Sequence, residues 1–214
     1  MTYAVLILFA YLFGSVPFAF LIGKAQGIDL RKVGSGNIGA NNAGRTLGKK
    51  WGIICFFLDV CKGLLPMLLV PLFGLIEQNA GPLQLTLWLL VGCAAVLGHV
   101  FSIYLKFKGG KGVATSFGIA LGLWPYYTIC ALFAIAIWSV VVLIWRYVSL
   151  ASIAGSVSFP VVLILAIILK PGWDFFSLWP LLIAATAIPL MVIIRHRENI
   201  KRLLAGTESK IFTR

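Results

Sequence analysis

Apolar residues dominate this chain, and charged residues interrupt them at only a few points. Stretches with no charge or almost none lie at 1–23, 51–76, 78–105, 112–145, 147–169 and 175–194. A membrane-spanning helix needs about 20 predominantly apolar residues. Five of the six stretches therefore predict one helix each.

The stretch 112–145 has 34 residues, more than one span needs and fewer than the roughly 40 that two would need. Trp124-Pro125-Tyr126-Tyr127 lies near its middle. Proline breaks helices, and Trp and Tyr favour the membrane interface. The pattern predicts two short helices joined there, with 112–123 short for a complete span. The chain is thus predicted to be an all-α integral membrane protein with seven transmembrane helices.

Composition supports a membrane protein. The chain is 61% hydrophobic, its mean hydropathy is +1.02 and 11% of its residues are charged, against roughly 25% in soluble domains. No internal repeat or linker is visible, so we expect residues 1–214 to form a single membrane-embedded domain. The first span lacks the basic residues that open a signal peptide, and we expect it to be retained.

The distribution of charge tests the count of spans. With seven spans, 16 of the 18 Lys and Arg residues fall on one side of the membrane, in 24–50, in 106–111, at Arg146 and in the tail from Arg195. Cytoplasmic loops collect Lys and Arg, so we expect an external N-terminus, a cytoplasmic C-terminus and an active site on the cytoplasmic face. The net charge of +12 is then explained by this bias with anionic lipid or substrate, and no nucleic-acid partner is expected.

The cysteines give no sign of a metal or a disulfide framework. All four lie in apolar stretches, without a CxxC pair or a Cys/His cluster. The sequence therefore predicts no metal site, and we expect no cofactor.

The first basic segment is rich in glycine and in hydrogen-bond donors. Gly34, Gly36 and Gly39 match the G-x-G-x-x-G spacing, but a membrane helix precedes them and the next acid, Asp59, lies in an apolar stretch. A dinucleotide-binding fold needs a preceding strand and an acid for the ribose, so that interpretation fails. The segment suits an oxyanion, although a solvated loop is the alternative. Its donors are Ser35, Asn37, Asn41, Asn42 and Arg45.

The second basic segment is the glycine-rich loop, residues 106–112. It is not a Walker A motif, because Gly112 follows Lys111 where Ser or Thr is required. Its glycines let backbone amides approach an anion, and Lys111 opens the next predicted helix, whose N-terminus favours negative charge. Lys106 and Lys108 are interpreted as topology charges or lipid contacts.

Two later segments carry weaker signals. Ser149 and Ser152 lie at the start of a predicted span, where serines commonly cap helices. His196 and Asn199 are spaced i, i+3 after the last span and share a face if the helix continues. The alternative for this segment is an interfacial basic tail with snorkelling side chains.

Three ionisable residues fall inside predicted spans. Asp59 and Lys62 are three residues apart, and charged groups in spans usually pair and face the protein interior. They predict a structural ion pair. For His99 a packed residue that hydrogen-bonds another helix and a functional role both stay open.

Four segments, in the same order, resemble the motifs of the PlsY family, the bacterial membrane glycerol-3-phosphate acyltransferases that use acyl phosphate. The segments are Gly34-Ser35-Gly36-Asn37 with Arg45, Lys108-Gly109-Gly110-Lys111-Gly112-Val113-Ala114, Arg146-Tyr147-Val148-Ser149-Leu150-Ala151-Ser152 and His196-Arg197-Glu198-Asn199-Ile200. The resemblance implies a seven-helix fold with an external N-terminus. It also implies acyl transfer from acyl phosphate to the 1-hydroxyl of glycerol 3-phosphate, giving 1-acyl-sn-glycerol 3-phosphate (lysophosphatidic acid) and phosphate.

The resemblance also implies roles for single residues. The implied catalytic residues are Ser35, Arg45, Lys111, Ser152, His196 and Asn199. The implied substrate- and phosphate-binding residues are Gly36, Asn37, Gly109, Gly110 and Gly112, and Glu208 is implied to be structural. We hypothesise that Arg45, Lys111 and the loop amides hold the two phosphates. Ser35 and Ser152 would donate near the reacting carbonyl, and His196 with Asn199 would bind glycerol phosphate or orient its hydroxyl.

The chemistry of the implied substrates sets further expectations. Acyl phosphate is already activated, so neither a covalent acyl-enzyme nor a metal is required. The expected partners are the two substrates, membrane lipid and a soluble enzyme that produces acyl phosphate, and the expected location is the bacterial cytoplasmic membrane, crossed several times. Two rival functions are a transporter of anionic solutes and a lipid-binding scaffold. Transporters typically show inverted repeats, which this sequence lacks.

Overall fold

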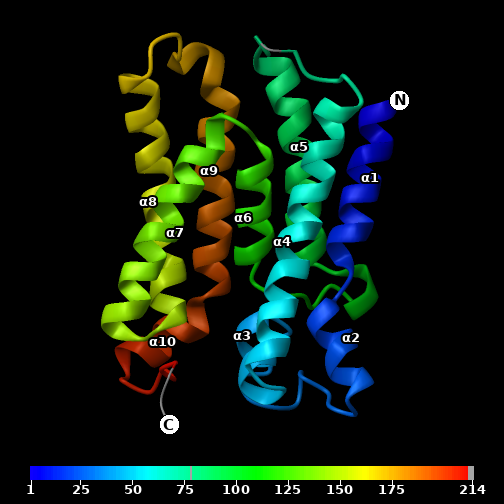
Figure 1. Cartoon of the computed structure of the whole chain (residues 1–214), viewed down its shortest axis with the longest axis vertical. Coiled ribbons are helices and arrows are strands. Elements are labelled where there is room, and N and C mark those ends of the chain that lie inside the picture. Colours follow the sequence, from blue (N-terminus) through cyan, green and yellow to red (C-terminus); the bar gives the residue numbers. More distant parts are fainter. Residues whose placement is uncertain (78, 212–214) are drawn as a thin grey trace. The chain divides into compact units, whose positions relative to one another are not determined.

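A computed structural model describes residues 1–77 and 79–211, and the described chain consists of helices and loops without a strand, which confirms the all-α prediction. The helices (Figure 1) are α1 (Thr2–Ser15), α2 (Phe18–Ala25), α3 (Ala40–Thr46), α4 (Lys49–Leu72), α5 (Pro82–Val100), the 3-10 helix η1 (Ile103–Leu105), α6 (Val113–Gly122), α7 (Tyr126–Trp145), α8 (Val148–Leu169), α9 (Phe175–Arg195) and α10 (Arg197–Leu204).

Six segments of the described chain are long and apolar enough to cross a membrane: α1 with α2, α4, α5 with η1, α7, α8 and α9. The predicted division of 112–145 is present as α6 and α7. However, α7 has 20 residues and is not short, whereas α6 has ten. Ten residues rise about 15 Å, half of a hydrocarbon core of about 30 Å. The count of seven transmembrane helices therefore rests on α6 and stays a prediction.

The first span is broken, where the sequence predicted one helix. Helix α1 ends at Ser15 and α2 begins at Phe18, with Val16 and Pro17 between them. Proline has no amide hydrogen to donate to the preceding turn and disfavours the helical conformation of the residue before it. The helical ladder stops at Pro17, although α4, α8 and α9 continue through internal prolines. The carbonyl of Val16 accepts from Phe18 N at 3.1 Å, and its second partner comes from α4.

The helices form two compact units. The first unit holds Met1–Gln78 and Leu90–Gly122, and the second holds Asn79–Leu89 and Leu123–Arg214. The division thus falls inside α5 and after α6, and each unit is described by itself below.

The first unit packs through glycines that let helix backbones touch. A methyl group added to Gly63 of α4 would collide with the carbonyl of Thr115 on α6, and one added to Gly118 of α6 would collide with the carbonyl of Val60 on α4. Gly14 of α1 meets the backbone of Ala95 on α5 in the same way. Small residues at such crossings are the usual means by which helices associate in membranes, and here they fix the position of α6.

In the second unit α8 lies beside both α7 and α9 (Figure 1). Tyr127 of α7 is buried, packs edge-to-face on Phe159 of α8 with ring centroids 5.1 Å apart, and donates a hydrogen bond to the carbonyl of Leu181 on α9. One side chain therefore links three helices. Because its hydroxyl is paired inside the protein, it meets the requirement that polar groups be satisfied at membrane depth.

Candidate active site

The loop between α2 and α3 is organised by one buried side chain, Asn42. Its amide nitrogen donates to the carbonyls of Leu30 at 3.0 Å and Val33 at 3.1 Å, and its oxygen accepts from the Ser35 amide at 2.9 Å. Gly34 packs against that oxygen so closely that a side chain there would collide with it, and its φ of +60° also favours glycine. Asn42 therefore fixes the loop and does not serve as a donor to an anion.

The candidate binding groups of this loop lie around that support. Ser35, Gly36 and Arg45 are exposed, and Gly36 has a φ of +69°. The side-chain oxygen of Asn37 is buried and has no hydrogen-bond partner in the described part of the chain.

The acid of this loop is already neutralised. Asp29 accepts from the side chain of Arg31 at 2.9 and 2.7 Å, and these hydrogen bonds hold the pKa of its carboxyl well below the usual range. An incoming anion therefore meets a segment whose remaining charges are cationic.

The glycine-rich loop turns back onto the end of α5. Gly109 N donates to Val100 O and Gly110 N to His99 O, each at 3.0 Å. The same two glycines touch α5 so closely that a methyl group would collide with the His99 carbonyl at Gly109 and with the His99 imidazole at Gly110. In this structure the amides of Gly109 and Gly110 donate within the backbone, and the expectation that these glycines bind phosphate stays a prediction.

The other candidate anion-binding groups of this loop lie farther along the chain. Lys111 is half-buried between the buried Gly110 and Gly112, whereas Lys106 and Lys108 are exposed. The carbonyl of Gly112 accepts from Ser116 N at 2.8 Å, the first bond of α6. The first amides of a helix have no acceptor within it and attract negative charge. Lys111 and the start of α6 are thus the loop's candidate phosphate contacts.

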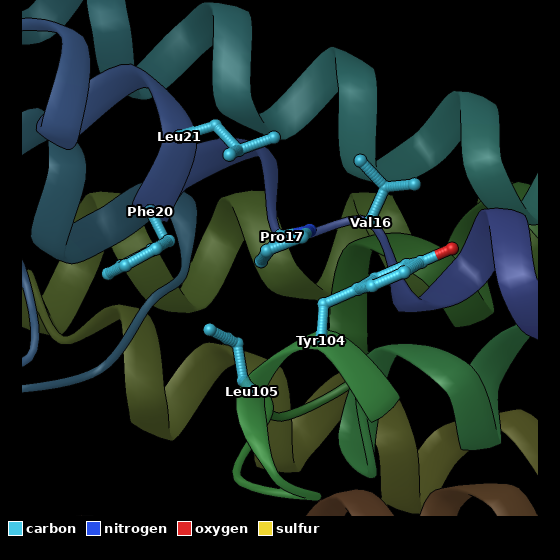
Figure 2. Close-up of a pocket in the computed structure, with 6 residues that line it drawn as sticks. All are labelled: Val16, Pro17, Phe20, Leu21, Tyr104 and Leu105. Atoms are coloured by element: carbon cyan, nitrogen blue, oxygen red, sulfur yellow. The ribbon is translucent and has the colours of Figure 1, made fainter.

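An apolar pocket of about 320 Å³ lies just before the same loop (Figure 2). Figure 2 shows Val16 and Pro17 at the α1–α2 break, Phe20 and Leu21 on α2, and Tyr104 and Leu105 on η1 around it. Its lining is almost entirely apolar. The pocket therefore suits a hydrocarbon chain and not a phosphate group.

In the second unit neither serine at the start of α8 is a helix cap, since the cap position is Tyr147 and no side chain bonds there. Ser152 Oγ donates to Val148 O at 2.9 Å and accepts from the Trp138 ring nitrogen at 3.4 Å. Ser149 Oγ donates to Glu208 at 2.8 Å. The hydroxyl proton of Ser152 thus points to a backbone carbonyl, and no base takes it.

His196 lies at a junction and not within a continuous helix. Helix α9 ends at Arg195, α10 begins at Arg197, and the His196 carbonyl accepts the first bond of α10 from Ile200 N at 2.9 Å. The ring is buried and its Nδ1 lies 2.8 Å from the Val192 carbonyl. A carbonyl only accepts, so Nδ1 carries a proton, and in the neutral ring Nε2 is the acceptor nitrogen.

Asn199 is held by Glu208. Glu208 Oε1 accepts from Asn199 Nδ2 at 2.7 Å as well as from Ser149, and Oε2 accepts from Arg202 Nε at 2.7 Å. We call these four residues the C-terminal clasp. Burial acts to raise the pKa of Glu208, but the three donated hydrogen bonds and the charge of Arg202 outweigh it and lower the pKa below its ordinary value. The clasp therefore holds a carboxylate.

The predicted residues divide between the units. Ser35, Asn37, Arg45 and Lys111 belong to the first unit, and Ser152, His196, Asn199 and Glu208 to the second. Sequence reasoning missed the structural roles of Asn42, Ser149 and Arg202. The available signal was Glu208, one of two acids in a basic tail, which called for donors. Among residues 1–77 and 79–211, no group of three or more His, Cys, Asp and Glu could hold a metal ion.

Comparison with known proteins covers nearly the whole chain. The model of the glycerol-3-phosphate acyltransferase family matches residues 4–206. A glycerol-3-phosphate acyltransferase of Trichlorobacter lovleyi is 48% identical over 201 residues, which are 94% of this chain and 93% of that protein. One of Aquifex aeolicus is 43% identical over 208 residues, 96% of this chain and 97% of the relative.

Two solved structures are similar to this chain over nearly its whole length. A crystal structure of PlsY, an integral membrane glycerol 3-phosphate acyltransferase, in its glycerol 3-phosphate form has a TM-score of 0.83 and 42% identity, covering 99% of this chain and 96% of that chain. The lysophosphatidic acid form gives a TM-score of 0.80 and 40% identity, covering 98% and 95%. The chain therefore belongs to the family of integral membrane glycerol-3-phosphate acyltransferases of the PlsY type.

Proposed function

We propose that this protein transfers an acyl group from acyl phosphate to the 1-hydroxyl of glycerol 3-phosphate, releasing 1-acyl-sn-glycerol 3-phosphate and phosphate. One observation carries the choice of donor. In the first unit Leu105 lines the apolar pocket, and the half-buried Lys111 follows it in the chain, on the glycine-rich loop. An acyl phosphate also consists of an apolar chain followed by an anionic phosphate, so the chain matches the pocket and the phosphate matches the lysine.

The proposed reaction has one transfer step and no covalent acyl-enzyme. The substrate hydroxyl oxygen bonds to the carbonyl carbon, the bond from that carbon to the phosphate oxygen breaks, and phosphate leaves with the electron pair. The hydroxyl proton passes to His196 or to a phosphate oxygen. The Ser152 hydroxyl donates to a backbone carbonyl, which argues against its use as a nucleophile, because a nucleophilic serine needs a base to take its proton.

What the protein supplies is then position and charge, which are often the largest contributions to catalysis. In the first unit we assign Lys111 and the start of α6, with Gly112, to the donor phosphate. Arg45 neutralises phosphate charge, and Ser35 donates to the developing oxyanion. Gly36 and Asn37 bind substrate, with the Asn37 oxygen as an acceptor for a substrate hydroxyl. Gly109 and Gly110 shape the loop.

In the second unit we assign His196 to the hydroxyl of glycerol 3-phosphate, which its Nε2 accepts. Asn199 binds the same substrate, and Ser152 donates near the reacting carbonyl after its hydroxyl rotates away from the Val148 carbonyl. Glu208 acts on Asn199 and is a positioning residue. The single acyltransferase domain over 1–214 stays a prediction.

We also propose that the N-terminus is external and that the glycine-rich loop and the C-terminus face the cytoplasm. The excess of Lys and Arg on one side supports this orientation. It gives the loop access to the soluble substrate and to a soluble enzyme that supplies acyl phosphate, in a bacterial cytoplasmic membrane.

Turnover by the purified protein tests the reaction. In detergent with glycerol 3-phosphate and palmitoyl phosphate we expect acylated glycerol phosphate and an equal amount of phosphate, measured by mass spectrometry and phosphate release. Lys111→Met should lower kcat/KM about 100–1,000-fold, as the loss of a charge stabiliser does. Lys108→Met, the same change at an exposed position of the same loop, should leave it unchanged. Turnover with palmitoyl-CoA alone, or solute uptake into vesicles without product, would contradict the proposal.

A His196→Ala variant tests the role of the imidazole. If Nε2 takes the hydroxyl proton, kcat should fall about 100-fold or more, with a smaller change in the KM for glycerol 3-phosphate. Steady-state kinetics at saturating donor measures both, and Arg197→Ala at the exposed neighbouring position is the control. A normal kcat with a raised KM would leave His196 only a binding role.

The C-terminal clasp predicts a pH-dependent stability. The folded state lowers the pKa of Glu208 from its ordinary 4.5, so the clasp's contribution is complete above that value and is lost as the pH falls through the lower folded-state pKa. At pH 7 Glu208→Gln should cost about 1–3 kcal/mol and lower the midpoint of thermal unfolding. Near pH 3 the gap between the two proteins should shrink. Glu198→Gln, an exposed acid on α10, should show neither effect, and an equal gap at both pH values would refute the assignment.

Cysteine labelling tests the orientation. With the four native cysteines replaced by alanine, Pro171→Cys should react with a membrane-impermeant maleimide in intact cells. Lys108→Cys and Lys201→Cys should react only after permeabilisation. Labelling of Lys108→Cys in intact cells would reverse the assignment.

A further inference from the structure

Three ionisable side chains lie buried inside the first unit, and none of them is assigned a substrate contact above. Asp59 and Lys62 of α4 form an ion pair with Nζ and Oδ1 2.8 Å apart, and Nδ1 of His99 on α5 lies 3.7 Å from the same carboxylate oxygen. Their side chains are 4%, 2% and 6% exposed. Ionisable groups in spans are costly and usually carry a function, so this group calls for an explanation beyond packing.

One end of the group holds the broken first span. Lys62 Nζ donates to the Val16 carbonyl at 3.0 Å and lies 5.6 Å from the centre of the Phe18 ring. Val16 stands at the α1–α2 break, which also lines the apolar pocket. Lys62 is therefore oriented by Asp59 on one side and by this backbone carbonyl on the other.

The other end of the group lies under the glycine-rich loop. The His99 carbonyl accepts from Gly110 N at 3.0 Å, and the His99 ring packs so closely on Gly110 that a methyl group there would collide with it. The next residue is Lys111. The backbone and the ring of His99 thus both hold the residue that precedes the proposed phosphate-binding lysine.

A solely structural ion pair does not account for this arrangement. Asp59 and Lys62 already neutralise each other, and the Val16 carbonyl takes a further hydrogen of the ammonium group. His99 makes a second contact with Asp59, and the same ring packs against Gly110 of the glycine-rich loop. The separation of 3.7 Å is longer than a hydrogen bond, so the buried carboxylate acts on the ring through charge. A ring oriented in this way forms a more rigid floor than a ring held by packing alone.

We propose that Asp59 and Lys62 fix the imidazole of His99, and that His99 positions the Gly110–Lys111 segment for the phosphate of the acyl donor. All three are positioning residues, because none is assigned to touch substrate. The inference rests on the proposed function for the identity of the ligand. The arrangement of the loop itself can be tested without it.

Two His99 variants separate the two contacts of the ring. His99→Phe keeps a flat ring under Gly110 and loses the contact with Asp59, while His99→Asn keeps a polar group near Asp59 and loses the ring. Both should speed amide hydrogen exchange at 107–111 and raise the KM for palmitoyl phosphate about 10–100-fold, with a much smaller change for glycerol 3-phosphate. Tyr11→Phe, which removes a hydrogen bond of 3.0 Å to Phe101 O at the same end of α5, is the control and should change neither.

A double variant controls for loss of folding, because it removes the ion pair without leaving one charge buried alone. Asp59→Asn with Lys62→Met removes both charges together, leaves no buried charge unpaired, and should give the same two effects. The proposal is overturned if His99→Phe retains wild-type exchange and wild-type KM, because ring packing alone would then suffice. Faster exchange with an unchanged KM also overturns it.

The two hypotheses fail in different ways. A wild-type protein that does not use acyl phosphate contradicts the proposed function, while hydrogen exchange in the His99 variants still tests the positioning of the loop. An active wild type with unaffected variants contradicts only the positioning.

Discussion

The Asp59–Lys62 ion pair is the interaction on which the first unit depends, because it pairs two charges where lipid offers no partner. Removing one member of a buried pair costs about 3–5 kcal/mol, a large part of the roughly 5–15 kcal/mol that keeps a domain folded. Lys62 of the pair also contacts the break in the first span. Pro17 interrupts the helical ladder there, and Lys62 supplies the Val16 carbonyl with a donor at 3.0 Å. The Val16 carbonyl at the break therefore has two donors, Phe18 N and Lys62 Nζ, where lipid offers none.

Close backbone contacts between helices also fix the position of the loop that bears Lys111. Gly63 and Gly118 bring α4 and α6 together, and Gly109 and Gly110 bring the loop onto α5. The segment between Val100 and Val113 is therefore fixed at both ends. A lysine held in this way loses less freedom when it binds an anion than a lysine on a mobile loop. The glycines thus serve the site through the absence of a side chain.

The helices could be predicted because membrane spans need long apolar runs, and the α6–α7 boundary because Trp124-Pro125 interrupts one. The direction in which the backbone amides of the glycine-rich loop point could not be predicted. A glycine-rich cationic loop has the same composition whether its amides face an anion or the neighbouring helix. Here the choice is made by the turn at Lys106 and Phe107, whose φ values of +52° and +61° lie in the left-handed region. Sequence gives no clue to two adjacent non-glycine residues in that region.

The partners of Glu208 could not be predicted from the sequence either. Ser149, Asn199 and Arg202 lie 59, 9 and 6 residues away from it, so no local pattern joins them. The clasp nevertheless has a chemical logic. Asn199 could rotate freely in solvent, but one of its hydrogens is taken by a carboxylate that two further donors keep charged. The amide is thereby fixed in one orientation, with its oxygen directed away from Glu208. The reaction proposed above relies on position and charge, and such a reaction needs supports of this kind behind the groups that hold its substrates.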